Sequence, residues 1–205
     1  MPADETTPVE RPASTDHPVH GLIAARWSPR ALDPDRPVER EKLESIFEAA
    51  RWAPSCFNDQ PWNFLVFTAE NHDALARARE CLSEGNDWAR KAPVLIFSVT
   101  RKNFSHNGKP NRFAEHDQGM ASVLAALEAV NRGLVFHQMA GFSRKKLAEY
   151  FPIPEGHEVM AAIAVGYPGK ISDLPPEKRE AETSPRERRP QTAFVHYHGW
   201  RPDKR

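Results

Sequence analysis

The stretch that decides the fold is Ala53-Pro54-Ser55-Cys56-Phe57-Asn58-Asp59-Gln60-Pro61-Trp62-Asn63-Phe64. It joins a predicted helix over residues 38–52 to a predicted strand over residues 62–68. Ser55, Cys56, Asn58, Asp59 and Gln60 can all form hydrogen bonds. Pro54 ends the helix and Pro61 stiffens the exit. Ordinary connections have about 4–6 residues and fewer polar side chains. We therefore expect a stiff polar loop that holds a flat polar ligand, with a capped solvent loop as the alternative.

Composition limits the classes of protein to which the chain can belong. Its 205 residues suffice for one domain with a core, and 28 basic residues balance 28 acidic ones. A net charge of zero gives no overall field that favours nucleic acid or a membrane surface. Two cysteines without a CxxC motif, and no secretory segment, predict a reducing compartment and a cytoplasmic location. No apolar run approaches the ~20 residues of a membrane span.

The hydrophobic pattern predicts helices and strands that alternate irregularly. Helices are expected within residues 20–31 and over 39–52, 73–82, 113–132 and 144–151, and strands over 62–68, 93–100 and 158–165. The helix over 113–132 is apolar on more than one face, so we expect it to be buried on most sides. Gly133 is its predicted C-cap, and Ser143 is the predicted N-cap of the next helix. This order favours an α+β layered domain.

Both ends of the chain and one internal loop differ in composition from the rest. Residues 1–18 are rich in Pro, Thr, Ser and charge and are predicted to be a disordered tail, followed by a single domain over 19–205. The C-terminal arm (about 170–205) contains a candidate edge strand over 193–197 but too few apolar residues to fold alone. It therefore needs its own domain or a second subunit to lie on. The Gly/Asn/Lys loop over 101–112 is expected to be mobile and a candidate cover for a site.

Arginines gather in two places along an otherwise neutral chain. Arg26 and Arg30 flank Ser28, and the arm contains Arg186, Arg188 and Arg189. Guanidinium forks match the oxygens of a phosphate, and each charge-assisted bond is worth about 1.5–3 kcal/mol. Two such clusters that met would hold a phosphate; solvated surface arginines are the alternative for the arm. The sequence has neither GxGxxG nor a Walker A motif, so side chains would do the binding.

Other kinds of catalytic site find little support. Cys56 has no evident base and is interpreted as a small residue beside a ligand, and Cys81 as a core residue. Residues 115–117 (Glu-His-Asp) point in different directions on a helix, and His196 and His198 are too few to ligate a metal. GxSxG is absent, so a hydrolase elbow is not predicted.

Segments spread along the chain resemble, in order, those of the nitroreductase family of FMN-dependent NAD(P)H oxidoreductases. They are Arg26-Trp27-Ser28-Pro29-Arg30, Ala53 through Trp62, Asp117-Gln118-Gly119-Met120-Ala121, Gly133-Leu134, Val165-Gly166-Tyr167-Pro168 and Arg186 through Pro190. Each segment is a weak signal alone, but their common order from Gly21 to Trp200 is specific. The resemblance implies a mixed sheet flanked by helices, in an intertwined homodimer whose extended C-terminal arms embrace the partner and which binds two FMN molecules between its subunits.

The resemblance also implies roles for particular residues. The FMN phosphate and ribityl chain would be held by Arg26, Ser28, Arg30, Arg186 and Arg188, with main-chain contacts from Trp27. The ring would be lined, from the other subunit, by Pro54, Ser55, Cys56 and Asn58. Main-chain groups of Val165 and Gly166 would lie near the ring nitrogen that accepts hydride. Cys56 stands where the family often has Ser, and Val165 replaces an acidic residue of one branch.

The implied activity is a ping-pong transfer of hydride from NAD(P)H to nitroaromatics, quinones or similar small acceptors, with no essential side-chain acid or base. Reductive dehalogenation and ring oxidation are alternative tasks for the same fold. A flavin-binding protein without turnover, or a structural dimer whose arginine arm binds acidic partners, remain further alternatives. Residues 101–112 and 137–142 are where substrate contacts would fall, without assigned roles.

Overall fold

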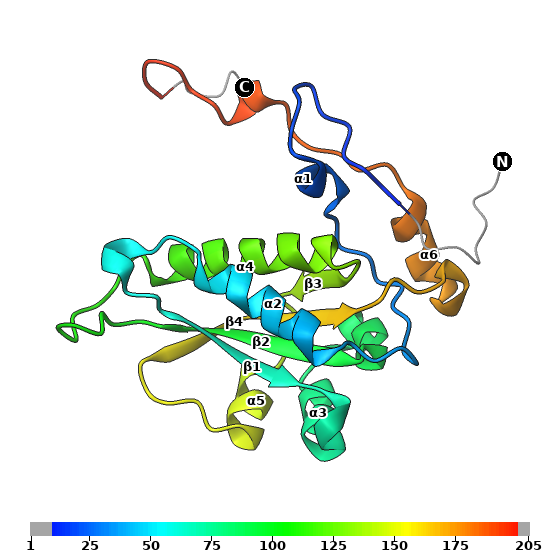
Figure 1. The fold of residues 1–205 in the computed structure, drawn as a ribbon, viewed down its shortest axis with the longest axis horizontal. Helices are drawn as coiled ribbons and strands as arrows, with labels where there is room; N and C mark the ends of the chain where they lie inside the picture. Colours follow the sequence, from blue (N-terminus) through cyan, green and yellow to red (C-terminus); the bar gives the residue numbers. More distant parts are fainter. Residues whose placement is uncertain (1–9, 201–205) are drawn as a thin grey trace.

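Four strands form one sheet in the order β1-β2-β4-β3 in the computed structural model, which describes residues 10–200 (Figure 1). The strands are β1 (Trp62–Phe67), β2 (Val94–Arg101), β3 (Val135–Met139) and β4 (His157–Gly166). All three pairings between them are antiparallel. The mixed sheet implied by the resemblance is therefore not formed by the described strands of one chain. A parallel pair requires a crossover connection or a strand from another chain.

Helices cover both faces of this sheet. In Figure 1, α2 (Arg40–Arg51) and α4 (Ala114–Asn131) lie on one face, and α3 (His72–Glu80) and α5 (Arg144–Tyr150) on the other. Side chains of β2 alternate between two cores, with Ile96 beneath α2 and α4 and Leu95 and Phe97 on the side of α3 and α5. Burying each such side chain contributes about 1.5–3 kcal/mol. This double burial explains the continuous apolar run that predicts the strand.

Helix α4 packs through small residues. Ala121, Ala125 and Ala129, four residues apart, are completely buried in the core that α4 shares with α2 and the sheet. On other sides Val123 is 46% exposed, and Met120 is only partly buried. The single chain therefore does not bury α4 on most sides, because nothing in the described residues covers this second apolar face.

Most predicted elements are confirmed within one or two residues. Gly133 adopts a φ of 72° after α4, and the Ser143 side chain accepts a hydrogen bond from the Lys146 N–H (3.2 Å) at the start of α5. Two differences stand out. Strand β3 was not predicted, and the helix expected within residues 20–31 is only α1 (Gly21–Ala25), because the chain is extended from Arg26 onward. None of the described helices is long and apolar enough to cross a membrane.

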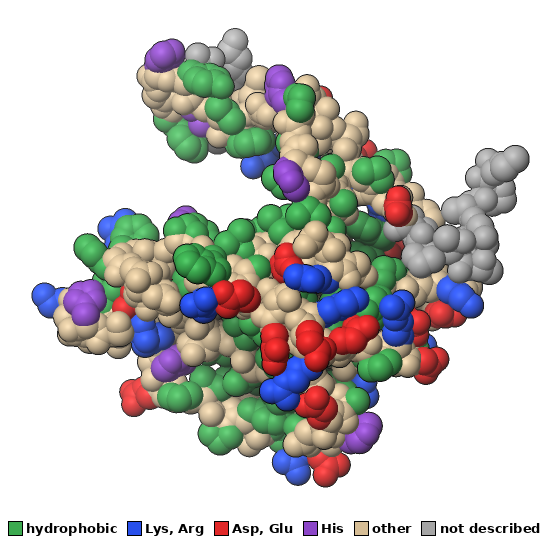
Figure 2. All heavy atoms as spheres, viewed as in Figure 1, with side chains coloured by type: hydrophobic (Ala, Val, Ile, Leu, Met, Phe, Trp, Pro, Cys, Tyr) green, Lys and Arg blue, Asp and Glu red, His purple; other side chains and the backbone are tan. Residues whose placement is uncertain are grey.

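The C-terminal arm extends away from the layered body. After α6 (Pro176–Thr183) it runs past α1 and leaves an open cleft above α4 (Figures 1 and 2). The candidate edge strand over 193–197 is wrong for this chain: Gln191–Ala193 is a 3-10 turn, and the Val195 N–H donates to the Gln191 carbonyl (2.8 Å). An extended segment needs a sheet edge to pair with, and the arm as described, up to Trp200, reaches none. Tyr197 (68% exposed) and Trp200 (84% exposed) remain uncovered.

The N-terminal segment lies against the base of the arm. Residues 1–9 of the predicted disordered tail lie outside the described residues, and 10–18 form no helix or strand. The Ala13 N–H donates to the Ala24 carbonyl (2.9 Å), and the Arg11 guanidinium to the Ala181 carbonyl (3.0 Å). This second half of the predicted tail is therefore in contact with α1 and α6.

Candidate functional site

Three of the arginines predicted to bind phosphate come together. The Arg186 guanidinium donates to the carbonyls of Ala24 (3.0 Å) and Arg26 (2.9 Å), which ties the arm to the end of α1. Burial lowers the pKa of Arg26, and the nearby charge of Arg188 lowers it further. Burial also lowers the pKa of Arg186, with contributions from Arg26, Arg188 and Arg11. The structure therefore brings Arg26 of the N-terminal cluster beside Arg186 and Arg188 of the C-terminal one.

These cations have no anionic partner in the part of the chain that the structure describes. Among the described residues, none of Arg26, Arg186 and Arg188 forms an ion pair with a carboxylate. Within residues 10–200, the Arg26 guanidinium donates one long hydrogen bond, to the Ser28 hydroxyl (3.5 Å). Like charges gathered without a counter-charge repel one another, and a bound anion would relieve that repulsion. The group is therefore suited to hold a phosphate.

Arg30 lies in a different environment from the other arginines. Its N–H donates to the Glu182 carboxylate (2.8 Å), and its guanidinium lies 3.6 Å from the same oxygen. Glu182 is 1% exposed, and burial raises its pKa although Arg30 opposes that rise. Part of the Arg30 charge is thus already balanced by α6, which fixes the backbone of the segment that contains Ser28.

His137, on β3, is a neighbour of this segment that sequence reasoning left unassigned. Its Nδ1 lies 2.8 Å from the Pro29 carbonyl, and its ring packs on Trp88 with 4.6 Å between centroids. Burial, together with the charges of Arg30 and Arg26, lowers the pKa of His137 to about 4. At neutral pH the ring is therefore neutral, and Nδ1–H donates to Pro29. The sequence signal that could have singled out His137 is its place among mostly apolar residues.

The polar loop over residues 53–61 is held from within and from α4. The Ser55 hydroxyl accepts a bond from the Gln60 N–H (3.1 Å), and the Asp117 carboxylate accepts one from the Cys56 N–H (2.9 Å). Asn58 is exposed, and its side-chain oxygen accepts a bond from the Gln60 amide (3.1 Å). The loop is therefore stiff and polar, as predicted, and it presents Ser55 and Asn58 at a surface.

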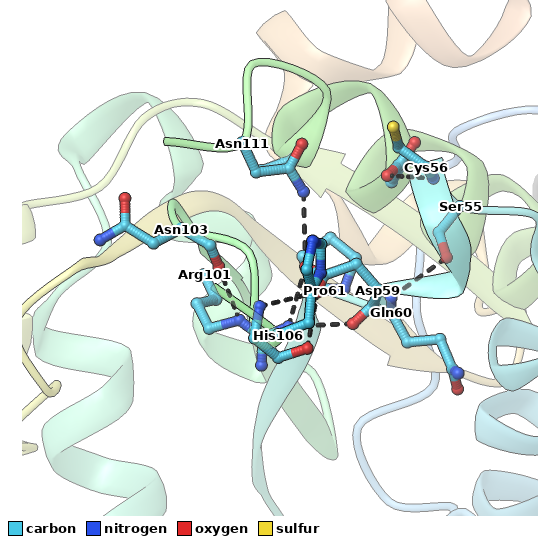
Figure 3. A network of polar contacts seen from close by, with 12 residues as sticks. Ser55, Cys56, Asp59, Gln60, Pro61, Arg101, Asn103, His106 and Asn111 are labelled. Carbon is cyan, nitrogen blue, oxygen red and sulfur yellow. Dashed lines mark hydrogen bonds and ion pairs between the residues drawn. The ribbon is translucent and has the colours of Figure 1, made fainter. Parts of the chain in front are cut away.

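Asp59 fastens the same loop to residues 101–112, as Figure 3 shows. Its carboxylate accepts bonds from the Ser105 N–H (2.8 Å) and hydroxyl (2.7 Å) and pairs with Arg101 (2.9 Å). Burial opposes ionisation of Asp59, but these bonds outweigh it and lower its pKa to about 2. Asp59 was counted among the polar side chains of the loop, but its buried anchoring role was not predicted.

Val165 and Gly166 do not lie at an open surface. Val165 is completely buried on β4 between Val94 of β2 and Phe136 of β3. A Cβ on Gly166 would lie 2.9 Å from Pro93, so the glycine is explained by close packing. Their predicted place beside a ring has no support in the geometry of one chain, because the central strand is covered on both sides.

The arginine group and the polar loop lie at opposite ends of α4. Asp117, which holds the loop, is in the first turn of this helix, whereas Val130, in the last turn, lines one cavity of about 550 Å³ with Trp27. At a rise of 1.5 Å per residue, about 20 Å separate these two positions. Figure 1 shows the same separation, with α1 and the 53–61 loop near different ends of α4. Within one chain, the arginine group and the polar loop therefore do not meet.

Two other possible kinds of centre find no support among the described residues. Cys81 is 1% exposed, and burial raises its pKa to about 11, which agrees with a core role. Residues 10–200 contain no group of His, Cys, Asp and Glu side chains able to hold a metal ion.

Comparison with known proteins places this geometry in context. A solved structure described as an oxidoreductase containing FMN is similar, with a TM-score of 0.86, 35% identity, and coverage of 93% of this chain and 96% of that one. A putative NADH dehydrogenase/NAD(P)H nitroreductase of Archaeoglobus fulgidus is 27% identical over 75% of this chain and 87% of its own. Iodotyrosine deiodinase 1 of Sus scrofa is 26% identical over 75% of this chain and 62% of its own. Residues 23–167 match the model of the nitroreductase family, and the chain belongs to that family.

Proposed function

We propose that this protein is an FMN-dependent oxidoreductase that takes hydride from NADH or NADPH and reduces nitroaromatics, quinones or similar acceptors in a ping-pong cycle. The observation that carries the proposal is the group formed by Arg26, Arg186 and Arg188, which have no carboxylate partner among the described residues. Such a group fits the doubly charged phosphate of FMN. The similar FMN-containing oxidoreductase structure supports the same cofactor.

The residues near the end of α1 would bind and orient the phosphate. Arg26 and Arg188 each have guanidinium N–H groups that bond to no acceptor among residues 10–200, and the Ser28 hydroxyl lies beside Arg26 (3.5 Å). Arg186 donates to main-chain carbonyls and therefore holds the Arg26 segment in place. Arg30, through Glu182, and Trp27, through its main chain, would complete this half-site. When bound, FMN supplies a ring that accepts and passes on hydride.

The second half-site would come from another copy of the chain. In a twofold dimer, the loop with Pro54, Ser55, Cys56 and Asn58 of one subunit would line the ring whose phosphate the other subunit binds. The separation of about 20 Å along α4 supports this arrangement, since one chain does not bring both groups together. The uncovered apolar face of α4 and the exposed Tyr197 and Trp200 of the arm also need a surface. Residues 193–197 of a partner would find an edge at β1, which would make the sheet mixed.

The turn after β3 replaces Gly166 in our proposal as the main-chain contact with the ring. The Gly141 carbonyl accepts three hydrogen bonds, from the Ser83 N–H (3.1 Å), the Ser83 hydroxyl (2.9 Å) and the Asn86 amide (2.8 Å). The Gly141 N–H has no partner among the described residues. This turn follows β3, whose His137 contacts the Pro29 carbonyl in the segment proposed to bind the phosphate. The turn therefore lies farther along the β3 edge of the sheet than the proposed phosphate position.

Spectroscopy tests the cofactor directly. Purified protein should be yellow, should release FMN on denaturation at one per chain, and should bleach anaerobically with NADH or NADPH. Colourless protein that takes up no added FMN would overturn the proposal. Flavin that binds but is reduced by neither nicotinamide would instead indicate a binding protein without turnover.

Complementation tests the shared site. Arg188→Ala and Asn58→Ala change residues of different half-sites, so each homodimer should bind FMN weakly at both sites. A heterodimer of the two variants would contain one intact site and should bind half the normal amount of FMN with normal affinity. If both half-sites belonged to one chain, no intact site would exist and mixing would restore nothing.

Reductive dehalogenation is a second candidate, favoured by the similarity to iodotyrosine deiodinase 1. It would use the same cofactor site with a halogenated phenol as acceptor. Halide release from iodotyrosine under reducing conditions, at a rate above that with nitroaromatics or quinones, would select this candidate.

A further inference from the structure

Residues 101–112 form an ordered hairpin rather than a loose cover. Asn103 and Pro110 form a β-bridge, and the Phe104 N–H donates to the Lys109 carbonyl (2.8 Å). Gly108 closes the turn with a φ of 70° and donates to the Phe104 carbonyl (2.9 Å). The hairpin is therefore defined by its own bonds, in addition to those it makes with the 53–61 loop.

Asp59 docks this hairpin on the loop proposed to line the cofactor. Its side chain is completely buried and makes an ion pair with Arg101 and two bonds with Ser105. The Arg101 guanidinium also donates to the Asp59 carbonyl (2.9 Å), so it holds both the side chain and the main chain. In Figure 3, Asp59 and Arg101 lie where the two segments meet. The loop and the hairpin thus form one rigid unit.

This unit exposes a group of aromatic rings at its surface. Phe57 is 83% exposed, and its φ of 54° lies in the left-handed region, which is a clear outlier for a bulky residue. Its ring contacts Phe104 (5.9 Å between centroids) and His106 (6.1 Å), and those two rings contact each other (5.3 Å). A strained, exposed aromatic residue is better explained by a ligand than by the stability of the fold.

We infer that Phe57, Phe104 and His106 form an aromatic wall that selects planar aromatic electron acceptors, and that Asp59 is its positioning residue. The inference rests on the proposed function, because Phe57 stands between Cys56 and Asn58, two residues proposed to line the ring. Aromatic rings attract one another in stacked and edge-to-face arrangements, so the wall favours flat acceptors over compact ions. With a quinone, NAD(P)H and one proton become NAD(P)⁺ while the quinone gains two electrons and two protons to form the hydroquinone.

Acceptor selectivity tests the wall on FMN-loaded, full-length protein. Phe57→Ala and Phe104→Ala should lower kcat/KM for 1,4-naphthoquinone about tenfold through a higher KM, while ferricyanide reduction changes less than about twofold, as expected for lost aromatic contacts. Phe57→Tyr keeps the ring and should retain most of the naphthoquinone rate. Trp52→Ala removes another exposed aromatic side chain (73% exposed) and should leave both acceptors unchanged.

The positioning role is tested by Asp59→Asn, which should also raise KM for naphthoquinone while ferricyanide reduction is retained. Should that variant fail to fold, Ser105→Ala removes one bond to the same carboxylate (2.7 Å) and should produce a smaller shift. Equal loss for both acceptors, no loss for either, or dissociation of the Phe57→Ala dimer would overturn the inference while leaving the proposed function intact. Absence of flavin from the unmodified protein would overturn both.

Discussion

Replacing Asp59 by Asn removes a charge whose contribution to stability follows from its surroundings. The carboxylate is fully buried, and Ser105 and Arg101 lower its pKa to about 2, against about 3.9 in an unfolded chain. At about 1.4 kcal/mol per pKa unit, ionised Asp59 stabilises the fold by about 2–3 kcal/mol at neutral pH. We expect Asp59→Asn to lose about this amount of unfolding free energy, because the amide keeps the size but not the charge of the side chain.

The dependence on pH distinguishes charge from shape. Since the folded pKa lies below the unfolded one, the stabilisation is complete above about pH 5 and is lost as the pH falls toward 2. Urea unfolding at fixed protein concentration should show a difference between wild type and variant that shrinks to roughly half between pH 7 and pH 3. Asp87→Asn, at an exposed ion pair with Arg90, should cost less than about 1 kcal/mol. A difference for Asp59→Asn that is equal at pH 7 and pH 3 would refute the reasoning.

Three further predictions concern other parts of the site. Arg188→Ala should weaken FMN binding about 10–100-fold in a fluorescence titration, as one charge-assisted contact is lost, whereas Arg189→Ala should change it less than about threefold. His137, with a pKa lowered to about 4, binds a proton more readily in the unfolded chain, so the free energy of unfolding should fall as the pH drops from 6.5 toward 4. His137→Phe should remove this pH-dependent loss in urea unfolding. Gly141→Ala should lower Tm because its Cβ would clash with the Ser83 hydroxyl, and adding Ser83→Ala should recover part of the loss in calorimetry.

Local pattern predicted the elements that pack within one chain. β2 reads as a continuous apolar run because both of its faces are buried, and α2 as an amphipathic helix because one face is. β3 was not predicted because it has only five residues and two of them, His137 and Gln138, are polar. Its existence depends on pairing with β4, which is not a local property. Residues 193–197 show the opposite: their composition favours a strand, but they pair with no sheet edge among the described residues.

The parts of the site divide in the same way, into those that the sequence pattern predicts and those that depend on contacts between distant residues. The resemblance implied that Arg26 would meet Arg186 and Arg188, whereas the clustering of charge alone left solvated surface arginines as the alternative for the arm. The pairing of Arg30 with Glu182 was not predictable, since nothing marks one glutamate of the charged arm as buried. Motif order suggested Gly166 as a ring contact, whereas packing against Pro93 accounts for that glycine. A motif position shows that a residue is constrained but not which neighbour constrains it.

The stiffness of the 53–61 loop has a physical origin that matters for binding. Phe57, Asn58 and Gln60 all adopt positive φ values, each at a cost of order 1–3 kcal/mol. The loop keeps this shape because two buried carboxylates hold it, Asp117 at Cys56 and Asp59 at the hairpin. Both anchors belong to the chain itself, so the loop is ordered before any ligand arrives and binding need not supply the free energy of ordering. A loop fixed in this way presents polar groups and an aromatic ring at constant positions, as the proposed contacts with a cofactor and its acceptor require.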